Sequence, residues 1–275
     1  MRRRAFGVLV LASTLTLAVH GLAQAPSTPD APATAKTWAS HAREIEDYLR
    51  AAEIVGGMTE VSTGVTRPHR AQLAPGGIVN QIVWKPLKPG RYQGYWESYK
   101  SEIAAYELDK VLELGMVPPT VEKQVKGEMG AAVMWVSPAK SFKELGGVPG
   151  QKGIPGPPTR DIPSWTKQLT RAKMFDNLIG NTDPNLGNWL VDPSWNIILI
   201  DHSRAFTTTK ELYHQLQYVD GPLWDNMQAL DEARLTSALG KWLDKPAIAA
   251  MLQRRAKMAL AIDKILAANP SMRIR

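Results

Sequence analysis

Apolar residues recur every three or four positions over six segments of the chain, and polar residues fill the positions between them. On a helix this spacing places the apolar side chains along one face, which can then pack against a core. Gly115 follows the second segment and is expected to cap its helix, because glycine readily adopts the left-handed conformation at a helix end. The spacing predicts helices over residues 38–52, 97–114, 165–179, 209–218, 227–239 and 245–268.

Between the first two helices the pattern changes to short extended runs separated by glycine, proline and serine. These turn-forming residues delimit three predicted strands, over residues 54–61, 65–73 and 78–84. Two further runs, residues 117–125 and 131–136, have the same character. The five runs together predict a small antiparallel sheet packed against one helix.

A polar-rich stretch over residues 175–206 contains two short apolar runs, WLV and IILI, separated by a turn-forming Asp-Pro-Ser sequence. A symmetric hairpin would pair Val191 with Ile198 and would therefore bring Asn188 opposite Asp201. Directly opposed residues of an antiparallel pair have Cβ atoms only about 4.5 to 5.5 Å apart. We therefore expect an amide oxygen and a carboxylate to converge on a site for a hard cation.

Proline and glycine are concentrated in residues 137–164, which is typical of a connection between two lobes. The predicted fold class is α+β. We expect residues 37–136 to form an N-lobe, a small antiparallel sheet with one helix, and residues 165–275 to form a mainly helical C-lobe that holds the hairpin.

The N-terminus has the features of an export signal. Residues 1–23 begin with three arginines, continue with an apolar run and end with small residues, as a removable signal peptide does. Residues 24–36 are rich in proline, alanine and threonine and are expected to be a flexible lead-in. We expect a periplasmic or secreted protein with no stable membrane anchor after cleavage.

The composition and charge of the chain exclude several kinds of site and partner. The 275 residues include no cysteine, which excludes disulfides, thiolate metal sites and a cysteine nucleophile. Loss of residues 1–23 removes three arginines and no acid, so the formal charge of +7 becomes +4. The remaining basic residues are scattered, so we expect no nucleic-acid partner. We expect a monomer.

The sequence also lacks the short motifs of several enzyme classes. It has no Walker-A pattern, no G-x-G-x-x-G after a strand, no G-x-S-x-G and no H-E-x-x-H. His202 and Ser203 are neighbours, and neighbours on a strand point to opposite faces, so they do not form a nucleophile and its base. Phosphoryl transfer remains, because it requires a cation held by oxygens, a carboxylate and a lysine.

Each of these groups has a candidate in the chain. Asp201 and Asn188 are candidate magnesium ligands, and Asp183 is a candidate for orienting an acceptor hydroxyl. Lys85, at the end of a predicted strand, is a candidate for contacting phosphates. Two glutamates could pair with Lys85. Glu102 and Glu107 lie on opposite edges of the apolar stripe of the second helix, and spacing cannot choose between them.

The spacing from Asp183 to Asn188 equals that of base and metal-binding amide in the kinase catalytic loop, and Ile-Asp-His-Ser at residues 200–203 follows a strand, as the metal-binding aspartate does. The stretch thus resembles atypical protein-kinase-like families: the secretory-pathway kinases of proteins and glycans, the phosphatidylinositol 3- and 4-kinases and the HipA-like kinases. In place of the Arg-His that usually follows the aspartate in this branch, the chain has Pro184-Asn185.

The resemblance implies a two-lobed protein-kinase-like fold, ATP with Mg²⁺ or Mn²⁺, and a protein or glycan acceptor. It also chooses Glu102 as the partner of Lys85. The implied site residues are catalytic Asp183, Lys85 and Glu102, phosphate-contacting Ser62, Thr63, Gly64, Thr66 and Lys85, and metal-binding Asn188 and Asp201. Two alternatives share this fold: a pseudokinase or nucleotide-binding regulatory module, and a nucleotidyl transferase. A third is an α+β protein whose acids are structural.

Overall fold

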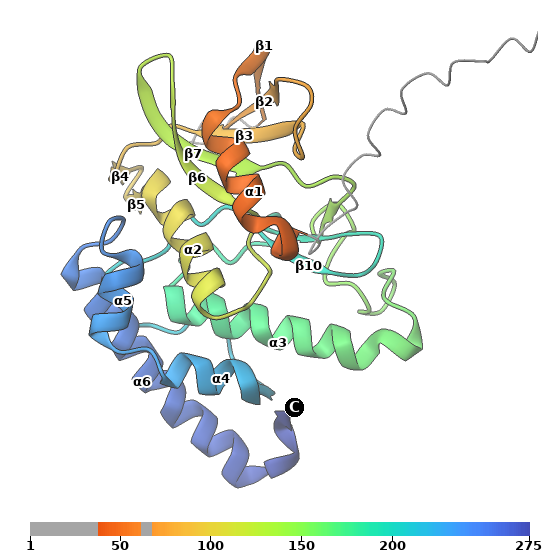
Figure 1. Cartoon of the computed structure of the whole chain (residues 1–275). Coiled ribbons are helices and arrows are strands. Elements are labelled where there is room, and N and C mark those ends of the chain that lie inside the picture. The colour runs from red at the N-terminus through yellow and green to blue at the C-terminus, as the bar shows by residue number, and fades with distance from the viewer. Residues whose placement is uncertain (1–37, 62–67) are drawn as a thin grey trace, which may run out of the picture. The chain divides into compact units, whose positions relative to one another are not determined.

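The computed structural model of the chain describes residues 38–61 and 68–275, all of which belong to one folded unit, Pro32–Arg275 (Figure 1). The predicted signal peptide and lead-in lie outside the described residues. So do Ser62, Thr63, Gly64 and Thr66, the predicted phosphate-contacting turn. Within the described residues, no helix combines the length and the apolar character needed to cross a membrane.

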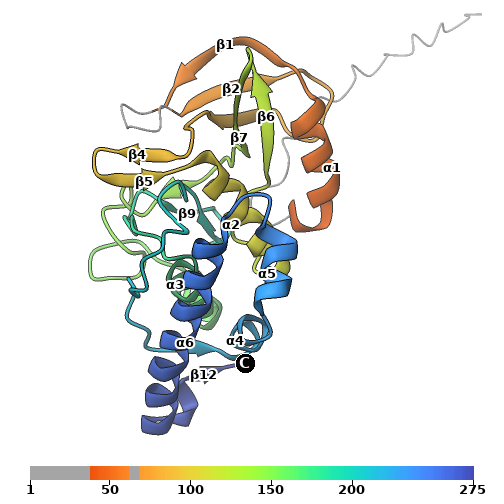
Figure 2. The ribbon, with the colours of Figure 1, turned by 90° about the vertical axis from the view of Figure 1, so that its left-hand side faces the viewer.

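The sheet lobe is built on five antiparallel strands in the order β1-β2-β3-β7-β6. Two helices, α1 and α2, pack against this sheet (Figures 1 and 2). The elements are α1 (Trp38–Ala51), β1 (Ile54–Glu60), β2 (His69–Leu73), β3 (Gln81–Lys85), α2 (Tyr99–Val111), β6 (Thr120–Val125) and β7 (Glu128–Met134). The sheet and helix expected in this part of the chain are therefore present.

The second lobe is mainly helical, with long helices α3 and α6 packed together (Figure 2). A three-stranded sheet in the order β10-β9-β8 contributes residues to the cores of both lobes. The elements are β8 (Lys140–Ser141), η1 (Thr159–Asp161), α3 (Ile162–Ile179), β9 (Trp189–Val191), β10 (Ile197–Leu199), β11 (Val219–Asp220), α4 (Gly221–Gln228), α5 (Glu232–Leu239), α6 (Lys245–Ala268), η2 (Pro270–Met272) and β12 (Arg273–Ile274).

Helix α2 lies between two apolar cores. Ala104, Ala105 and Leu108 belong to the large core of the helical lobe. Tyr99 and Ile103, nearer its start, pack with residues of β7 in the sheet lobe. Because its faces are committed to both lobes, α2 has little freedom to rotate, and a polar side chain on it is held in a fixed direction.

The predicted helix over residues 97–114 is shorter in the structure. Glu97 is in a strand, and Ser98 caps the helix by accepting a hydrogen bond from the Lys100 N–H at 3.0 Å. At the other end the left-handed residue that closes the helix is Glu113, at φ +51°, and the prediction of Gly115 as the cap is wrong. The Leu114 N–H returns to the Asp109 carbonyl at 3.0 Å, which ends the helix before Gly115.

Two predictions for the C-terminal part are also wrong. Residues 209–218 are not helical, because their backbone is bound by side chains of other helices: Asn177 pairs with the backbone of His214, and Arg254 donates to the Thr209 carbonyl. Residues 227–239 belong to two helices, because Asp231 starts α5 by capping it through the Arg234 N–H. The last predicted helix is confirmed as α6.

The expected register of the β9–β10 hairpin is wrong by one residue. Val191 pairs with Ile197, not Ile198, and the Ile200 N–H donates to the Asn188 carbonyl at 3.0 Å. Asn188 is therefore opposite Ile200, and Asp201 lies just beyond the pair. Asp192 stabilises the turn between the two strands, because its Oδ1 accepts from the backbone N–H groups of residues 194 and 196 at 2.9 and 2.7 Å.

Several small elements had no sequence prediction. A hairpin of β4 (Gly90–Tyr92) and β5 (Tyr95–Glu97) is inserted between β3 and α2. Strand β8 lies inside the proline- and glycine-rich stretch and pairs with β9, so part of that stretch belongs to the three-stranded sheet. Figure 2 shows the β4–β5 hairpin at the side of the molecule where the two lobes meet.

The role of Asp192 in fixing the register can be tested by substitution. Asp192→Ala removes two hydrogen bonds to backbone N–H groups and a third, to the Asn196 side chain. We expect the free energy of unfolding to fall by about 2 kcal/mol in a urea titration, because three part-buried donors lose their acceptor. The exposed Asp263 on α6 is the control, and Asp263→Ala should change stability by less than about 0.5 kcal/mol. Equal effects would contradict this role.

Candidate active site

Three charged side chains from three separate elements meet between the lobes. Lys85 is the last residue of β3, Glu102 lies in the first turn of α2, and Asp201 follows β10. The Lys85 Nζ donates to Glu102 Oε1 at 2.6 Å and to Asp201 Oδ1 at 2.9 Å. The Lys85 and Glu102 side chains are buried, whereas that of Asp201 is 37% exposed. The free side of Asp201 therefore faces solvent, where a ligand could reach it.

The backbone directs Asp201 toward Lys85. Asp201 has a left-handed conformation, with φ +60°, which aspartate tolerates better than most residues. The chain therefore leaves the direction of β10 at this residue. The next residue is held by Glu102, whose Oε2 accepts from the His202 N–H at 3.1 Å. Glu102 thus binds both the lysine and the backbone beside Asp201.

The charges of this trio are strongly coupled. Burial favours a neutral lysine, but the charges of Asp201 and Glu102 outweigh burial and raise the pKa of Lys85 above its ordinary value. Burial opposes ionisation of Asp201 as well, but the Lys85 ammonium holds the pKa of Asp201 below its usual range. Lys85 is therefore a permanent cation and Asp201 a permanent anion near neutral pH.

The structure decides between the two glutamates that spacing left open. Glu102 is buried and accepts a hydrogen bond from the Lys85 ammonium group. Glu107 lies on another face of α2, where it binds Lys110 at 3.2 Å. Lys110 also binds Glu46 of α1 at 2.7 Å, so Glu107 belongs to a surface ion-pair network. Of the two, only Glu102 contacts Lys85.

Asp183 lies in the loop between α3 and β9, and its carboxylate is held at both oxygens. Oδ1 accepts from the Asn185 side chain at 2.9 Å, and Oδ2 lies 3.4 Å from an Arg204 nitrogen. The loop backbone is fixed too, because Asn181 Oδ1 accepts from the Asp183 N–H and the Asn188 amide donates to the Asp183 carbonyl, both at 3.1 Å. The side chain of Asp183 is 33% exposed.

The two predicted metal ligands have suitable chemistry. Within the described residues, no group of three or more His, Cys, Asp or Glu side chains could hold a metal ion. Magnesium needs no such group, because it often takes one or two protein oxygens together with substrate phosphates and water. Asn188 uses its side-chain nitrogen to bind Asp183, so its oxygen is not engaged in that bond, and it lies one pair away from Asp201 on the hairpin. This donor set fits a magnesium or manganese ion.

Sequence reasoning missed Arg204, which binds Glu97 and reaches Asp183. No motif marked Arg204, because its partner Glu97 lies 107 residues away in the chain. Asp176 at the end of α3 binds Asn181, Trp189 and His214. The available signal was the position of Arg204, which follows the Asp-His-Ser sequence directly.

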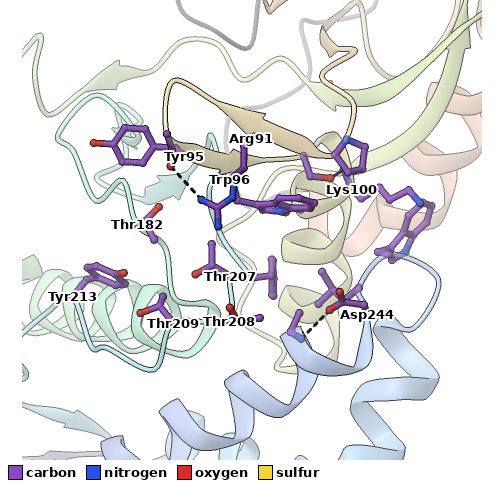
Figure 3. Close-up of a pocket in the computed structure, with 18 of the residues that line it drawn as sticks. Arg91, Tyr95, Trp96, Lys100, Thr182, Thr207, Thr208, Thr209, Tyr213 and Asp244 are labelled. Carbon is purple, nitrogen blue, oxygen red and sulfur yellow. Dashed lines mark hydrogen bonds between the residues drawn. The ribbon is translucent and has the colours of Figure 1, made fainter.

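A cavity of about 860 Å³ opens beside the loop that carries Asp183, below the β4–β5 hairpin (Figure 3). Lys85, Glu102 and Asp201 do not line it, so it is distinct from the charged trio. Its wall includes Thr182, the neighbour of Asp183. Figure 3 shows Arg91 and Trp96 of the hairpin extending toward Thr207 and Thr208 on the opposite side. The cavity therefore combines cationic, aromatic and hydroxyl groups next to the candidate base.

Comparisons with known proteins identify the fold. No family model and no curated protein matches the chain. The structure is similar to a Golgi casein kinase with Mn/ADP bound, with a TM-score of 0.61, 14% identity, and coverage of 84% of this chain and 77% of that one. It is also similar to hydra Fam20 with sugar, with a TM-score of 0.60, 15% identity, and coverage of 84% and 90%.

A third similar structure is the Helicobacter pylori proinflammatory kinase CtkA, with a TM-score of 0.53, 13% identity, and coverage of 80% of this chain and 98% of that one. Two of these three solved proteins are kinases by name, the Golgi casein kinase and CtkA. At these identities the likeness establishes the fold. The predicted two-lobed, protein-kinase-like α+β fold is therefore confirmed.

His202 gives the site a testable pH dependence. It is buried, and burial lowers its pKa despite the opposing charges of Glu102 and Asp176. The unfolded imidazole has a pKa of about 6.5. Below that pH the unfolded state binds a proton that the folded state resists, so the stabilising contribution of neutral His202 is present above about pH 6.5 and is lost as the pH falls further.

We expect the free energy of unfolding to decrease between about pH 7.5 and pH 5.5, and this residue should add a slope approaching about 1.4 kcal/mol per pH unit. His202→Gln should be less stable at neutral pH and should show a shallower decrease. Urea titrations across this range measure both curves. Parallel curves for the two proteins would show that His202 does not carry the dependence.

Proposed function

We propose that this chain is a metal-dependent kinase that transfers the γ-phosphoryl group of ATP to a hydroxyl group of a protein or glycan. The observation that supports this most directly is the charged trio of Lys85, Glu102 and Asp201 beside a loop that carries Asp183 and Asn188. Phosphoryl transfer needs these groups: a cation for phosphates, oxygens for a metal and a carboxylate for the acceptor.

Lys85 would contact the nucleotide phosphates. A lysine whose pKa is raised cannot act as a base near neutral pH, but it supplies a fixed positive charge. Glu102 would keep the ammonium group in place, since it is buried and binds Lys85 at 2.6 Å. This pair therefore suits charge stabilisation of phosphates better than proton transfer.

Asn188 and Asp201 would hold Mg²⁺ or Mn²⁺, which neutralises charge on the phosphates when bound. Asp183 would orient the acceptor hydroxyl and accept its proton. The acceptor oxygen forms a bond to the γ-phosphorus, the bond from that phosphorus to the bridging oxygen of ADP breaks, and ADP leaves with those electrons. The carboxylate of Asp183 is partly exposed, so an acceptor can approach it.

The acceptor would approach through the cavity below the β4–β5 hairpin, because this cavity reaches the residue next to Asp183. Its aromatic rings suit a sugar ring or an apolar side chain, and its cationic groups suit an anionic acceptor. The solved neighbours include a casein kinase and a protein with sugar. Both acceptor classes therefore remain in the proposal.

The N-terminal sequence supports export, so the proposed kinase acts in the periplasm or outside the cell. We further propose that it works as a monomer, without nucleic acid and without a stable membrane anchor after cleavage. Nucleotide would then have to reach it outside the cytoplasm.

Nucleotide binding can be tested with two buried lysines of the same sheet. Lys123 on β6 binds the backbone carbonyls of Leu49, Arg50 and Ala52 and contacts no carboxylate in the described structure. We expect ATP with Mg²⁺ or Mn²⁺ to stabilise the wild type and Lys123→Met, by about 2.7 kcal/mol at one hundred times the dissociation constant. Lys85→Met should lose most of this gain, and Asp201→Ala should lose its metal-dependent part. Thermal unfolding measures each case.

Label from the γ- or α-phosphate identifies the reaction. Transfer of γ-label to protein or glycan acceptors, lost in Asp201→Ala, is the expected result. Transfer of α-label would indicate a nucleotidyl transferase on the same fold. Stabilisation by nucleotide without any transfer would indicate a pseudokinase or regulatory module, and the absence of both would contradict the proposed function.

Two glutamates on α2 provide a matched test of the lysine partner. Glu102→Gln keeps the size of the side chain but removes the charge next to Lys85, whereas Glu107→Gln does the same on the surface. We expect Glu102→Gln to lower kcat by about 100-fold, because Lys85 loses its orientation, and Glu107→Gln to leave kcat within about twofold. Initial rates with γ-labelled ATP measure both. Equal rates for the two variants would exclude the assigned role of Glu102.

A further inference from the structure

A second buried carboxylate lies where the lobes meet. Glu97 ends strand β5 of the inserted hairpin and has 0% exposure. Its Oε1 is 2.9 Å from one terminal nitrogen of Arg204 and accepts from Arg204 Nε at 3.0 Å. A buried carboxylate is costly unless it is paired. Glu97 and Arg204 therefore hold each other, and through them the hairpin holds the segment that follows Asp201.

Other contacts fix the same arginine. The Tyr95 ring lies against the guanidinium, with 4.4 Å between the guanidinium carbon and the ring centroid. The Arg204 carbonyl accepts from the Thr182 hydroxyl at 3.1 Å, and Figure 3 shows Tyr95 and Thr182 on the same side of the cavity. One residue earlier, the Ser203 carbonyl accepts from the Ser98 N–H at 3.0 Å. Both the backbone and the side chain of Arg204 are thus constrained.

The contacts with Glu97 also fix the direction of the second terminal nitrogen of Arg204. Nε and one terminal nitrogen are used on Glu97, and the other terminal nitrogen lies 3.4 Å from Asp183 Oδ2. Because the group is rigid and always charged, fixing one edge fixes the other. Glu97 therefore sets the direction in which Arg204 meets the candidate base.

The local sequence of the catalytic loop makes this contact significant. After Asp183 the chain continues with Pro184 and Asn185, so the loop itself supplies an amide for Oδ1 and no cation. The cation at Oδ2 comes from Arg204, beyond β10. The two oxygens of Asp183 are thus held by two different segments, and only one of them depends on the hairpin of the sheet lobe.

We propose that Arg204 is a positioning residue for Asp183, held in place by Glu97 and Tyr95 of the β4–β5 hairpin; this inference rests on the proposed kinase function. Arg204 keeps the carboxylate turned toward the acceptor side, and the hairpin makes this orientation depend on correct docking of the sheet lobe. Tyr95 and Trp96 of the same hairpin line the cavity, so the element that fixes the base also forms part of the proposed acceptor entrance.

If the Glu97–Arg204 pair only stabilised the fold, its loss would lower kcat no more than the loss of a similar ion pair elsewhere. A matched ion pair away from the site is therefore the control. Arg171 on α3 provides it. Its side chain is 24% exposed, close to the 23% of Arg204, and it lies 4.0 Å from the buried carboxylate of Asp220. Arg171 does not line the cavity and contacts none of the proposed catalytic residues.

The experiment compares Arg204→Gln, Arg204→Lys, Glu97→Gln and Arg171→Gln in the full chain, with γ-labelled ATP and with thermal unfolding in the presence of ATP and Mg²⁺. We expect Arg204→Gln to lower kcat by about 10- to 100-fold, with the KM for ATP and the stabilisation by nucleotide unchanged, because a small displacement of a catalytic group has effects of this size. Arg204→Lys should restore part of kcat, and Glu97→Gln should lower it through Arg204.

Arg171→Gln is expected to keep the wild-type kcat even where it lowers the unfolding temperature. A kcat for Arg204→Gln within twofold of wild type, in an active enzyme, would overturn the positioning role and leave the proposed function intact. Loss of nucleotide binding together with kcat in Arg204→Gln would also overturn the positioning role, because the residue would then support the whole fold of the site. A wild-type chain without transfer activity would overturn both proposals.

Discussion

The structure depends on one buried interaction, the contact of Lys85 with Glu102 and Asp201. Burying charges is unfavourable unless each finds a partner, and removal of one partner leaves an uncompensated charge in a low-dielectric site. Here the three charges come from a strand of the sheet lobe, a helix packed on both cores and a hairpin of the helical lobe. Their pairing therefore requires the lobes to be assembled in one way, and it leaves one carboxylate partly exposed for a ligand.

A second contact between the lobes, from Glu97 to Arg204, also pairs a buried charge, and it lies on the proposed acceptor side of the site. The first contact fixes the groups suited to nucleotide phosphates and metal, and the second fixes Asp183. Helix α2 connects them, because Glu102 lies within its first turn and Ser98, directly after Glu97, caps it. The groups proposed for the nucleotide and those proposed for the acceptor are therefore both held near the first turn of α2, although they belong to distant parts of the sequence.

The periodicity of apolar residues predicted those helices whose own side chains decide their conformation. The periodicity of α1 and α6 was sufficient, since each buries a mainly apolar face, which in α6 also includes Arg254. The same periodicity gave a wrong prediction where side chains from distant helices form hydrogen bonds with the backbone. Residues 209–218 have helical spacing, but Asn177 and Arg254 bind their peptide groups and hold them irregular. The hairpin register failed for a similar reason, because Asp192 closes a turn that no apolar pattern specifies.

The sequence by itself determined the kinds of groups available and their approximate elements: the candidate residues Lys85, Asp183, Asn188 and Asp201, and a sheet lobe followed by a helical lobe. The resemblance, not spacing, chose Glu102 over Glu107. Only the tertiary structure placed Glu102 on Lys85, turned Asp201 toward it through a left-handed residue, and brought Arg204 to Asp183. The physical reason is that composition and periodicity record local preference, whereas the direction of a charged side chain is set by partners that only folding brings within reach.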